Sequence, residues 1–346
     1  MMGACPSLQR ASPLSAPFRI TTRIDFEAKG RQLGHLSVPH SSNESAWGAI
    51  RVPIAVIGHG QGPTLLFVGG NHGDEYEGPI ALLKLARSLP PEALQGRVIL
   101  LPALNLPAVV ASTRVSPIDQ VNMNRAFPGD PLGTPTLMIA DYVRRRILPL
   151  ADAVVDLHSG GRTLNFVPFC GMHQLADAAQ MAATEAALLA FGAPLSVIIR
   201  EFDVAGMLDT AVEELGKPFL FTELGGGGTV SAATVAIAER GLRNVLVHFG
   251  MLDEPAEPAP TRLVHSPDAS WFVIAEDRGI LELLIDLGHE VAAGQALAQI
   301  HDIEHPQRPP AIYRAGQSGL LIGRHAPGLI KPGDCLAVIA TDYEAG

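Results

Sequence analysis

Between residues 64 and 252 the chain alternates short apolar runs with longer stretches in which apolar residues recur at helical spacing. The run TLLFVGG at 64–70 is followed by PIALLKLARSL at 79–89, where apolar residues stand at 80, 82, 83 and 85. Runs of the first kind predict buried strands, and stretches of the second kind predict helices. In the same way, further strands are expected within 97–104, 151–161, 194–200 and 218–228, and further helices within 134–148, 176–191, 206–216 and up to about 252.

Apolar strands separated by helices predict an α/β fold with a mixed, largely parallel, doubly wound sheet that carries helices on both faces. In such sheets ligands bind at the carboxyl ends of the strands. Upstream, β-like runs at 18–26 and 51–58 are separated by the polar stretch HSSNESAWG. The pattern leaves open whether residues 18–50 pack on this sheet or on the C-terminal part of the chain.

The helical spacing disappears after DEPAEPAPT at 253–261, which has the composition of a linker. Beyond it the chain twice repeats a β-run, a glycine turn and a second β-run, which resembles a biotinyl/lipoyl-like barrel-sandwich. Carrier domains of that kind need a lysine at a hairpin tip, and Lys331, the sole lysine after 217, stands in a different turn context. The expected organisation is a loose N-terminus (1–17), an N-terminal β segment (18–50), a catalytic domain (51–253) and a small all-β domain (262–346).

Composition excludes several classes of protein. With 346 residues, 47% of them hydrophobic and 17% charged, the chain can bury a large core. A formal net charge of -10 argues against nucleic acid as the main partner. Three widely separated cysteines cannot form a disulfide framework. Because no apolar run is long enough for a signal peptide or a membrane span, we expect a cytoplasmic protein with a small-molecule partner, and the pattern also allows a homo-oligomer.

Two glycine-framed motifs follow apolar strands and contain metal-binding side chains. His72 and Glu75 form an H-x-x-E pair in GGNHGDEYEGP, and His158 ends the strand in VVDLHSGG. A catalytic zinc usually has three protein ligands, and histidine and glutamate are typical ones. Asp156 lies two residues before His158 and so on the same face of the strand, where it can orient a ligand imidazole. Each histidine could alternatively have a purely structural role.

Further polar side chains could complete a hydrolytic site. Glu223 ends the apolar strand of PFLFTELGGGG, where a carboxylate is suited to acid–base work, although it could instead cap a helix. Arg114, Asn124 and Arg125 lie in one long polar segment. Arginine binds a carboxylate through two parallel hydrogen bonds, so this segment could hold a carboxylate group, although surface ion pairing would place the same residues there.

The sequences GNHGDEYEG, NMNRAFPG, DLHSGG and TELGGGG, in this order, resemble the motifs of the succinylglutamate desuccinylase/aspartoacylase family, which is related in fold to zinc carboxypeptidases. The resemblance covers roughly residues 50–252 and implies one zinc ion per chain. It implies that the zinc ligands are His72, Glu75 and His158, that Glu223 is catalytic, and that Asn105, Arg114, Asn124 and Arg125 bind substrate. The turn NLPA around Asn105 departs from the family pattern by one extra residue before the proline.

The resemblance is closest to a branch of the family that deacetylates Nα-acetyl-L-2,4-diaminobutyrate during ectoine breakdown, and there it extends nearly end to end. It implies a zinc-dependent amide hydrolase acting on an N-acyl amino acid. The alternatives are a deacylase of N-succinylglutamate or N-acetylaspartate, a zinc carboxypeptidase, and a metal-free binding module. A diaminobutyrate side chain would require an acceptor for its ammonium group, and Glu201, Asp203 and Asp209 are equal candidates on sequence.

Overall fold

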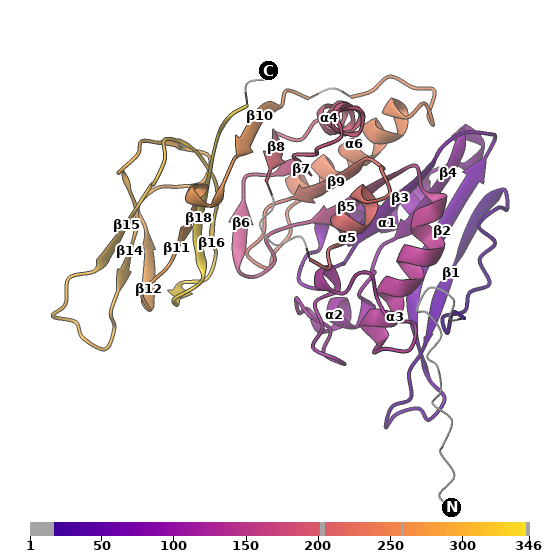
Figure 1. Ribbon diagram of the computed structural model, residues 1–346, viewed down its shortest axis with the longest axis horizontal. Coiled ribbons are helices and arrows are strands. Elements are labelled where there is room, and N and C mark those ends of the chain that lie inside the picture. The colour runs from indigo at the N-terminus through magenta and orange to yellow at the C-terminus, as the bar shows by residue number, and fades with distance from the viewer. Residues whose placement is uncertain (1–16, 201–204, 258, 344–346) are drawn as a thin grey trace, which may run out of the picture.

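The computed structural model describes residues 17–200, 205–257 and 259–343. Among these residues, fourteen strands form one mixed sheet and four form a separate small antiparallel sheet (Figure 1). The loose N-terminus expected over 1–17 lies almost wholly outside the described residues, as do Glu201 and Asp203. None of the helices within the described ranges combines the length and the apolar character needed to cross a lipid bilayer.

The large sheet extends from the N-terminal strands to the C-terminal ones. Its strands are β1 (Gly30–Pro39), β2 (Ala49–His59), β3 (Thr64–Gly69), β4 (Gly96–Leu101), β5 (Ala153–His158), β6 (Leu164–Phe166), β7 (Phe169–His173), β8 (Leu195–Ile199), β9 (Phe219–Glu223), β10 (Arg262–Ser266), β11 (Phe272–Ile274), β13 (Glu290–Val291), β16 (Gly319–His325) and β18 (Cys335–Asp342). They lie in the order β1-β2-β4-β3-β5-β9-β7-β8-β10-β18-β16-β13, with β11 beside β18 and β6 beside β16. Because β5 pairs in parallel with β3 on one side and with β9 on the other, the carboxyl ends of these three strands meet at one edge of the sheet.

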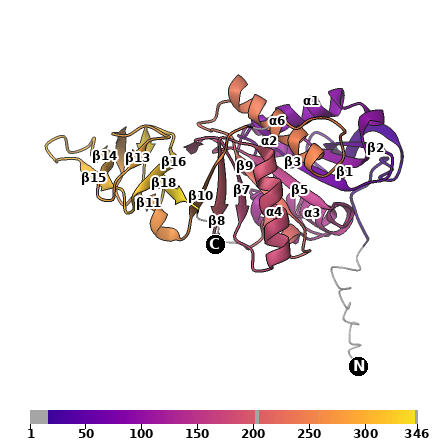
Figure 2. The ribbon, with the colours of Figure 1, turned by 90° about the horizontal axis from the view of Figure 1, so that it is seen from above.

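Helices cover both faces of this sheet, as its alternating buried side chains require. The helices are α1 (Glu77–Ser88), α2 (Leu106–Ala111), α3 (Pro135–Tyr142), α4 (Ala178–Phe191), α5 (Leu208–Glu213) and α6 (Ala232–His248). Within β3, Leu65 and Phe67 belong to the core beneath α1, α4 and α6, whereas Leu66 and Val68 belong to the core beneath α3 and α5. Figure 2 shows α1 and α6 on one side of β3 and α3 on the other. An all-apolar strand is therefore buried on both sides.

Several expected elements differ from those in the structure. The β-run over 18–26 is not a strand, because Thr21 forms only an isolated bridge with Ser37. Instead β1 is the edge strand and pairs with β2, so the segment 18–50 packs on the large sheet. The helix expected over 134–148 is regular only as far as Tyr142. A single π-helical turn (Val143–Ile147) and a 3-10 turn (Leu148–Leu150) follow, where Pro149 lacks the N–H that a regular helix needs.

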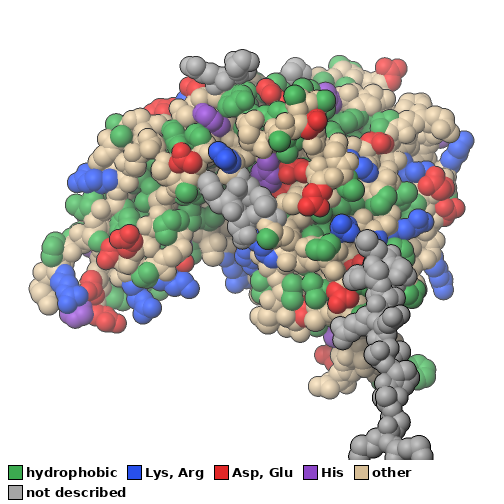
Figure 3. Space-filling model, in the orientation of Figure 1, with side chains coloured by type: hydrophobic (Ala, Val, Ile, Leu, Met, Phe, Trp, Pro, Cys, Tyr) green, Lys and Arg blue, Asp and Glu red, His purple; other side chains and the backbone are tan. Residues whose placement is uncertain are grey.

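The C-terminal part of the chain is joined to the α/β part through hydrogen-bonded strands. After the segment 253–261, β10 pairs in parallel with β8 and antiparallel with β18. In addition β6, from the α/β part, pairs with β16. The small sheet contains β12 (Gly279–Leu283), β14 (Ala296–His301), β15 (Ala311–Arg314) and β17 (Leu329–Ile330), with a hydrophobic core of its own. On the face shown in Figure 3, acidic, basic and hydrophobic side chains are interspersed.

Candidate active site

The H-x-x-E pair and His158 come together at the edge where β3 and β5 end. His72 and Glu75 lie in the loop between β3 and α1, and His158 is the last residue of β5. Glu75 Oε1 is 2.8 Å from His72 Nδ1, and Glu75 Oε2 is 2.8 Å from His158 Nδ1. All three side chains are buried, and one ligand atom from each lies within 4.8 Å of the others. A single cation can therefore be reached by all three.

The two imidazoles are oriented through their other ring nitrogens. His158 Nε2 lies 2.8 Å from Asp156 Oδ2, and His72 Nε2 lies 3.1 Å from Asn122 Oδ1. An oxygen acceptor at Nε2 keeps a proton on that nitrogen, so Nδ1 is the nitrogen that can give its lone pair to a metal ion once any proton on it is lost. Both Nδ1 atoms face Glu75, so the pattern is that of ligand imidazoles held by outer hydrogen-bond partners. Asn71 in turn donates to Asp156 Oδ2 at 2.8 Å.

The charge state of this cluster also suits a metal ion. Burial alone would raise the pKa of Glu75, yet His72 and His158 together hold it well below its usual range. Burial lowers the pKa of His72, which favours the neutral ring that can coordinate a metal. Burial alone would also lower the pKa of His158, but Asp156 and Glu75 raise it well above its usual value, so its ring carries a proton that a metal ion would have to displace. Two imidazoles and one carboxylate match the donor set of a catalytic zinc site with an open fourth position.

Glu223 is brought next to His158 by the register of two strands. It ends β9, and in the parallel pairing of β5 with β9 it stands directly opposite His158. Its Oε2 is sealed from solvent and has no hydrogen-bond partner among the described residues. Burial and the neighbouring Glu75 raise the pKa of Glu223 to about 8. A carboxyl group with such a pKa can hold a proton near neutral pH, as a general acid or base must.

A cavity of about 160 Å³ opens beside the metal-type cluster. It is lined by His72, Arg114, Asn124, Arg125, His158, His173, Met207, Asp209, Phe219, Phe221 and Glu223. This volume is below the range typical of sites for drug-sized molecules, so the cavity suits a small metabolite.

The expected substrate-binding residues are only partly assembled around this cavity. Arg114 lines it and places Nη1 3.4 Å from His72 Nδ1. Asn124 and Arg125 also line it, and the Asn124 side-chain oxygen accepts the Leu208 N–H at 2.9 Å. Asn105 is not among the described lining residues: it is fully buried beneath the loop, where its N–H donates to Gly70 O at 2.9 Å.

The structure adds side chains that the sequence patterns had not singled out. Asn122 orients His72, Asn71 supports Asp156, and His173 from β7 lines the cavity. Strand β7 was itself missed, because its five residues FCGMH carry no clear apolar alternation. Asn122 lies in the NMNR motif, but nothing local in the sequence connects it with His72, which is 50 residues away.

The remaining residues of the first motif hold the two ligand-bearing loops in place. A Cβ atom at Gly73 would lie 2.0 Å from the Ala108 carbonyl, so α2 can approach only a glycine. Asp74 is not one of the three clustered donors; its Oδ2 accepts the Arg162 N–H at 2.8 Å. That hydrogen bond joins the loop after β3 to the loop after β5, and so fixes His72 relative to His158.

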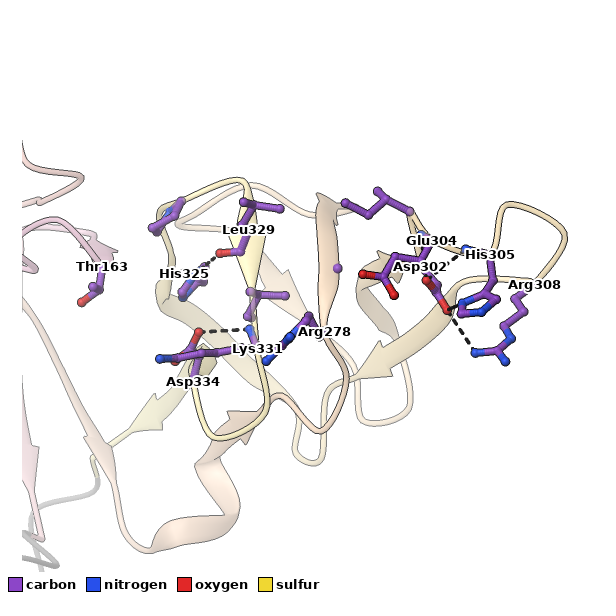
Figure 4. A pocket seen from close by; sticks show the side chains of 14 residues that line it. Thr163, Arg278, Asp302, Glu304, His305, Arg308, His325, Leu329, Lys331 and Asp334 are labelled. Carbon is purple, nitrogen blue, oxygen red and sulfur yellow. Dashed lines mark hydrogen bonds and ion pairs between the residues drawn. The ribbon is translucent and has the colours of Figure 1, made fainter.

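A roomier cavity of about 750 Å³ lies in the C-terminal part, and its lining includes Arg278, Asp302, His325 and Lys331 (Figure 4). None of the site residues expected from sequence is among the described residues that line it. In Figure 4 Asp302 interacts with its own neighbours rather than with a common centre. The smaller cavity is therefore the candidate active site.

Comparisons with known proteins concern first the α/β part of the chain. The family model for the succinylglutamate desuccinylase/aspartoacylase catalytic domain matches residues 61–249, more than half of the chain and the part that contains every residue of the metal-type cluster. The chain belongs to this family.

Relatives of high similarity extend over the whole chain. A curated protein of Halomonas elongata, N-alpha-acetyl-L-2,4-diaminobutyric acid deacetylase, is 46% identical over 346 residues, which cover 99% of each chain. The product-bound structure of the ectoine utilization protein EutE (DoeB) from Ruegeria pomeroyi is 51% identical, with a TM-score of 0.93 over 94% of this chain and 99% of that one. A succinylglutamate desuccinylase structure from Silicibacter sp. TM1040 is 48% identical, with a TM-score of 0.92 over 95% of this chain and 100% of that one.

Proposed function

We propose that this protein is a zinc-dependent amide hydrolase that removes the acetyl group from Nα-acetyl-L-2,4-diaminobutyrate in ectoine degradation. The observation that carries the proposal is the buried cluster of His72, Glu75 and His158 with Glu223 beside it in a small cavity. The full-length similarity to a deacetylase of that substrate, and to an ectoine utilization protein, supports the choice of substrate.

His72, Glu75 and His158 would hold the zinc ion through Nδ1, a carboxylate oxygen and Nδ1. Zinc, when bound, supplies a Lewis acid that polarises a carbonyl group and acidifies water. Glu223 lines the same cavity and has one carboxylate oxygen without a hydrogen-bond partner among the described residues. That oxygen would take a proton from the attacking water and deliver it to the departing amine nitrogen, so the reaction needs only one proton-carrying side chain.

Arginine side chains would position the substrate. Arg114 and Arg125 both line the cavity and can bind the α-carboxylate of an N-acyl amino acid by paired hydrogen bonds. Fixing that carboxylate would hold the amide bond in one place relative to Glu223. Asn124 supports the arrangement through its link to Leu208. Asn105 is fully buried and is not among the described lining residues, so the proposal assigns the carboxylate to the arginines and not to Asn105.

The proposal also includes a division of the chain. Residues 51–253 would form the catalytic unit, with a doubly wound, zinc carboxypeptidase-like sheet, residues 18–50 would extend that sheet, and residues 262–346 would form a barrel-sandwich-like β domain. The family match over 61–249 and the separate core of the small sheet support it.

A second candidate is the removal of succinate from N-succinylglutamate, because a structure that is 48% identical carries the name of a desuccinylase. Purified full-length protein, loaded with zinc, should be assayed for acetate or succinate release from Nα-acetyl-diaminobutyrate, N-acetylaspartate and N-succinylglutamate. We expect kcat/KM to be highest, by at least about tenfold, for the diaminobutyrate derivative. A preference for either anionic substrate would refute the proposed substrate, and activity that survives complete removal of divalent metal would refute the zinc chemistry.

A further inference from the structure

We propose that Asp209 is the specificity-determining residue that binds the side-chain ammonium group of the substrate. This inference rests on the proposed function, because it concerns the side chain of the amino acid whose acyl group is removed. Asp209 is the second residue of α5, is only 4% exposed, and lines the same cavity as Arg125 and Glu223.

Oδ1 of Asp209 accepts two hydrogen bonds, and Oδ2 accepts none from the described residues. Oδ1 accepts the backbone N–H of Thr210 at 2.5 Å and the hydroxyl of Thr210 at 3.1 Å. Within the part of the chain that the structure describes, Asp209 forms no ion pair with a lysine or arginine. A carboxylate removed from water needs a donor or a counter-ion. A cation inside the cavity would supply both.

The groups around Asp209 do not fully compensate the negative charge of its carboxylate. Burial raises its pKa to about 6, and the nearby His173 offsets that effect only in part. His173 is itself engaged, since its Nδ1 lies 2.9 Å from Glu213 Oε1. Glu213 adds negative charge close to Asp209, and the region therefore favours a bound cation and disfavours an anion.

Among the carboxylates that line the cavity, Asp209 is the one left to bind an ammonium group. Of the described lining residues only Asp209 and Glu223 carry a carboxylate, and Glu223 stands beside His158, where a proton carrier is required. Glu213 does not line the cavity and is paired with His173. A substrate held by arginine at its α-carboxylate could thus place its side-chain ammonium at Asp209.

This arrangement selects by repulsion as well as by attraction. An aspartate or glutamate side chain in the same position would bring a second carboxylate against Asp209. Two unpaired carboxylates in a buried site are strongly unfavourable, so the same residue would reject the anionic substrates used by other members of the family.

The test compares two substrates that differ in one charge. Nα-acetyl-L-2,4-diaminobutyrate carries a terminal ammonium where Nα-acetyl-L-norvaline carries a methyl group. In the full-length, zinc-loaded Asp209→Asn variant we expect the ratio of kcat/KM for the cationic over the neutral substrate to fall about 10- to 100-fold, mainly through a higher KM for the cationic substrate. A fall of this size corresponds to the loss of one charge-assisted hydrogen bond. Activity on the norvaline derivative should remain within about threefold of the parent protein.

Glu214→Gln is the matched control, because Glu214 directly follows α5 and is exposed; its ratio should not change. If Asp209→Asn does not fold, Asp209→Ser removes the same carboxylate and is read in the same way. Suppose that the parent enzyme prefers the cationic substrate. If Asp209→Asn then leaves the ratio of kcat/KM values unchanged, or lowers kcat/KM equally for both substrates, Asp209 does not have the proposed role, whereas the proposed function stands. A parent enzyme that prefers an anionic side chain would overturn both.

Discussion

The contact between Asp156 and His158 offers a direct test of how the metal-type cluster is organised. Asp156 Oδ2 is 2.8 Å from His158 Nε2 and accepts a second hydrogen bond, also of 2.8 Å, from Asn71. Asp156 and Asn71 are each 1% exposed, so water cannot replace either partner. In Asp156→Asn the shape is kept, and the side-chain oxygen can still accept the imidazole proton, but the negative charge is lost.

The size of the effect follows from these contacts. A hydrogen bond to a charged group contributes about 1.5–3 kcal/mol, against about 1 kcal/mol for a neutral one. Replacing outer partners of metal-binding histidines typically weakens metal affinity about 10- to 100-fold. We therefore expect Asp156→Asn to bind zinc about 10- to 100-fold more weakly, which corresponds to about 1.4–2.7 kcal/mol.

The assay is competition for zinc between the metal-free protein and a chromophoric chelator of known affinity. Thermal unfolding of the metal-free variant checks that the fold is intact. Asp286→Asn serves as the control, because Asp286 is exposed and lies in the C-terminal part of the chain. A folded Asp156→Asn protein that binds zinc within threefold of the parent would show that Asp156 does not orient His158 for a metal.

Three further outcomes are expected. Glu223→Gln should lower kcat by about 10²- to 10⁴-fold while zinc, measured by elemental analysis, stays bound; an active variant would exclude Glu223 as the proton carrier. In the substrate-free protein the pKa of Asp209 is raised from 3.8 to about 6, so ionisation of this carboxyl group lowers the free energy of unfolding as pH rises through that window. Asp209→Asn should therefore be more stable than the parent protein by up to about 3 kcal/mol at pH 8, but not below pH 4. Urea unfolding at the two pH values measures this difference. Cys170 is fully buried, which raises the pKa of its thiol, and mass spectrometry should find it unlabelled by a thiol reagent until the protein unfolds; rapid labelling of the native protein would contradict this burial.

Much of the fold was predictable because it depends on local patterns. The mainly apolar runs at 64–70 and 151–158 became β3 and β5, since strands covered on both faces need apolar side chains at most positions. Shorter elements were not predictable. Strand β7 is placed between β9 and β8, antiparallel to β9, and its pairing partners lie more than twenty residues away in sequence. Nothing in the local sequence of β7 indicates which strands it pairs with.

The same distinction applies to the candidate site. That His72, Glu75, His158 and Glu223 follow apolar strands is visible in the sequence, and parallel strands bring their carboxyl ends to one edge. The sequence pattern does not choose among Glu201, Asp203 and Asp209, because each could equally be a capping or surface acid. Of the three, only Asp209 lies within the described residues, where it is buried in the cavity wall and has no lysine or arginine partner among them.

The sequence alone determined the α/β class, the strand ends and the kinds of side chain found there, because backbone period and side-chain chemistry are local properties. The tertiary structure decided which of those side chains meet. Glu75 and His158 are 83 residues apart, and His72 and Asn122 are 50 residues apart, yet each pair is joined by one hydrogen bond. Such contacts depend on strand order, register and packing, which are fixed only when the whole core forms.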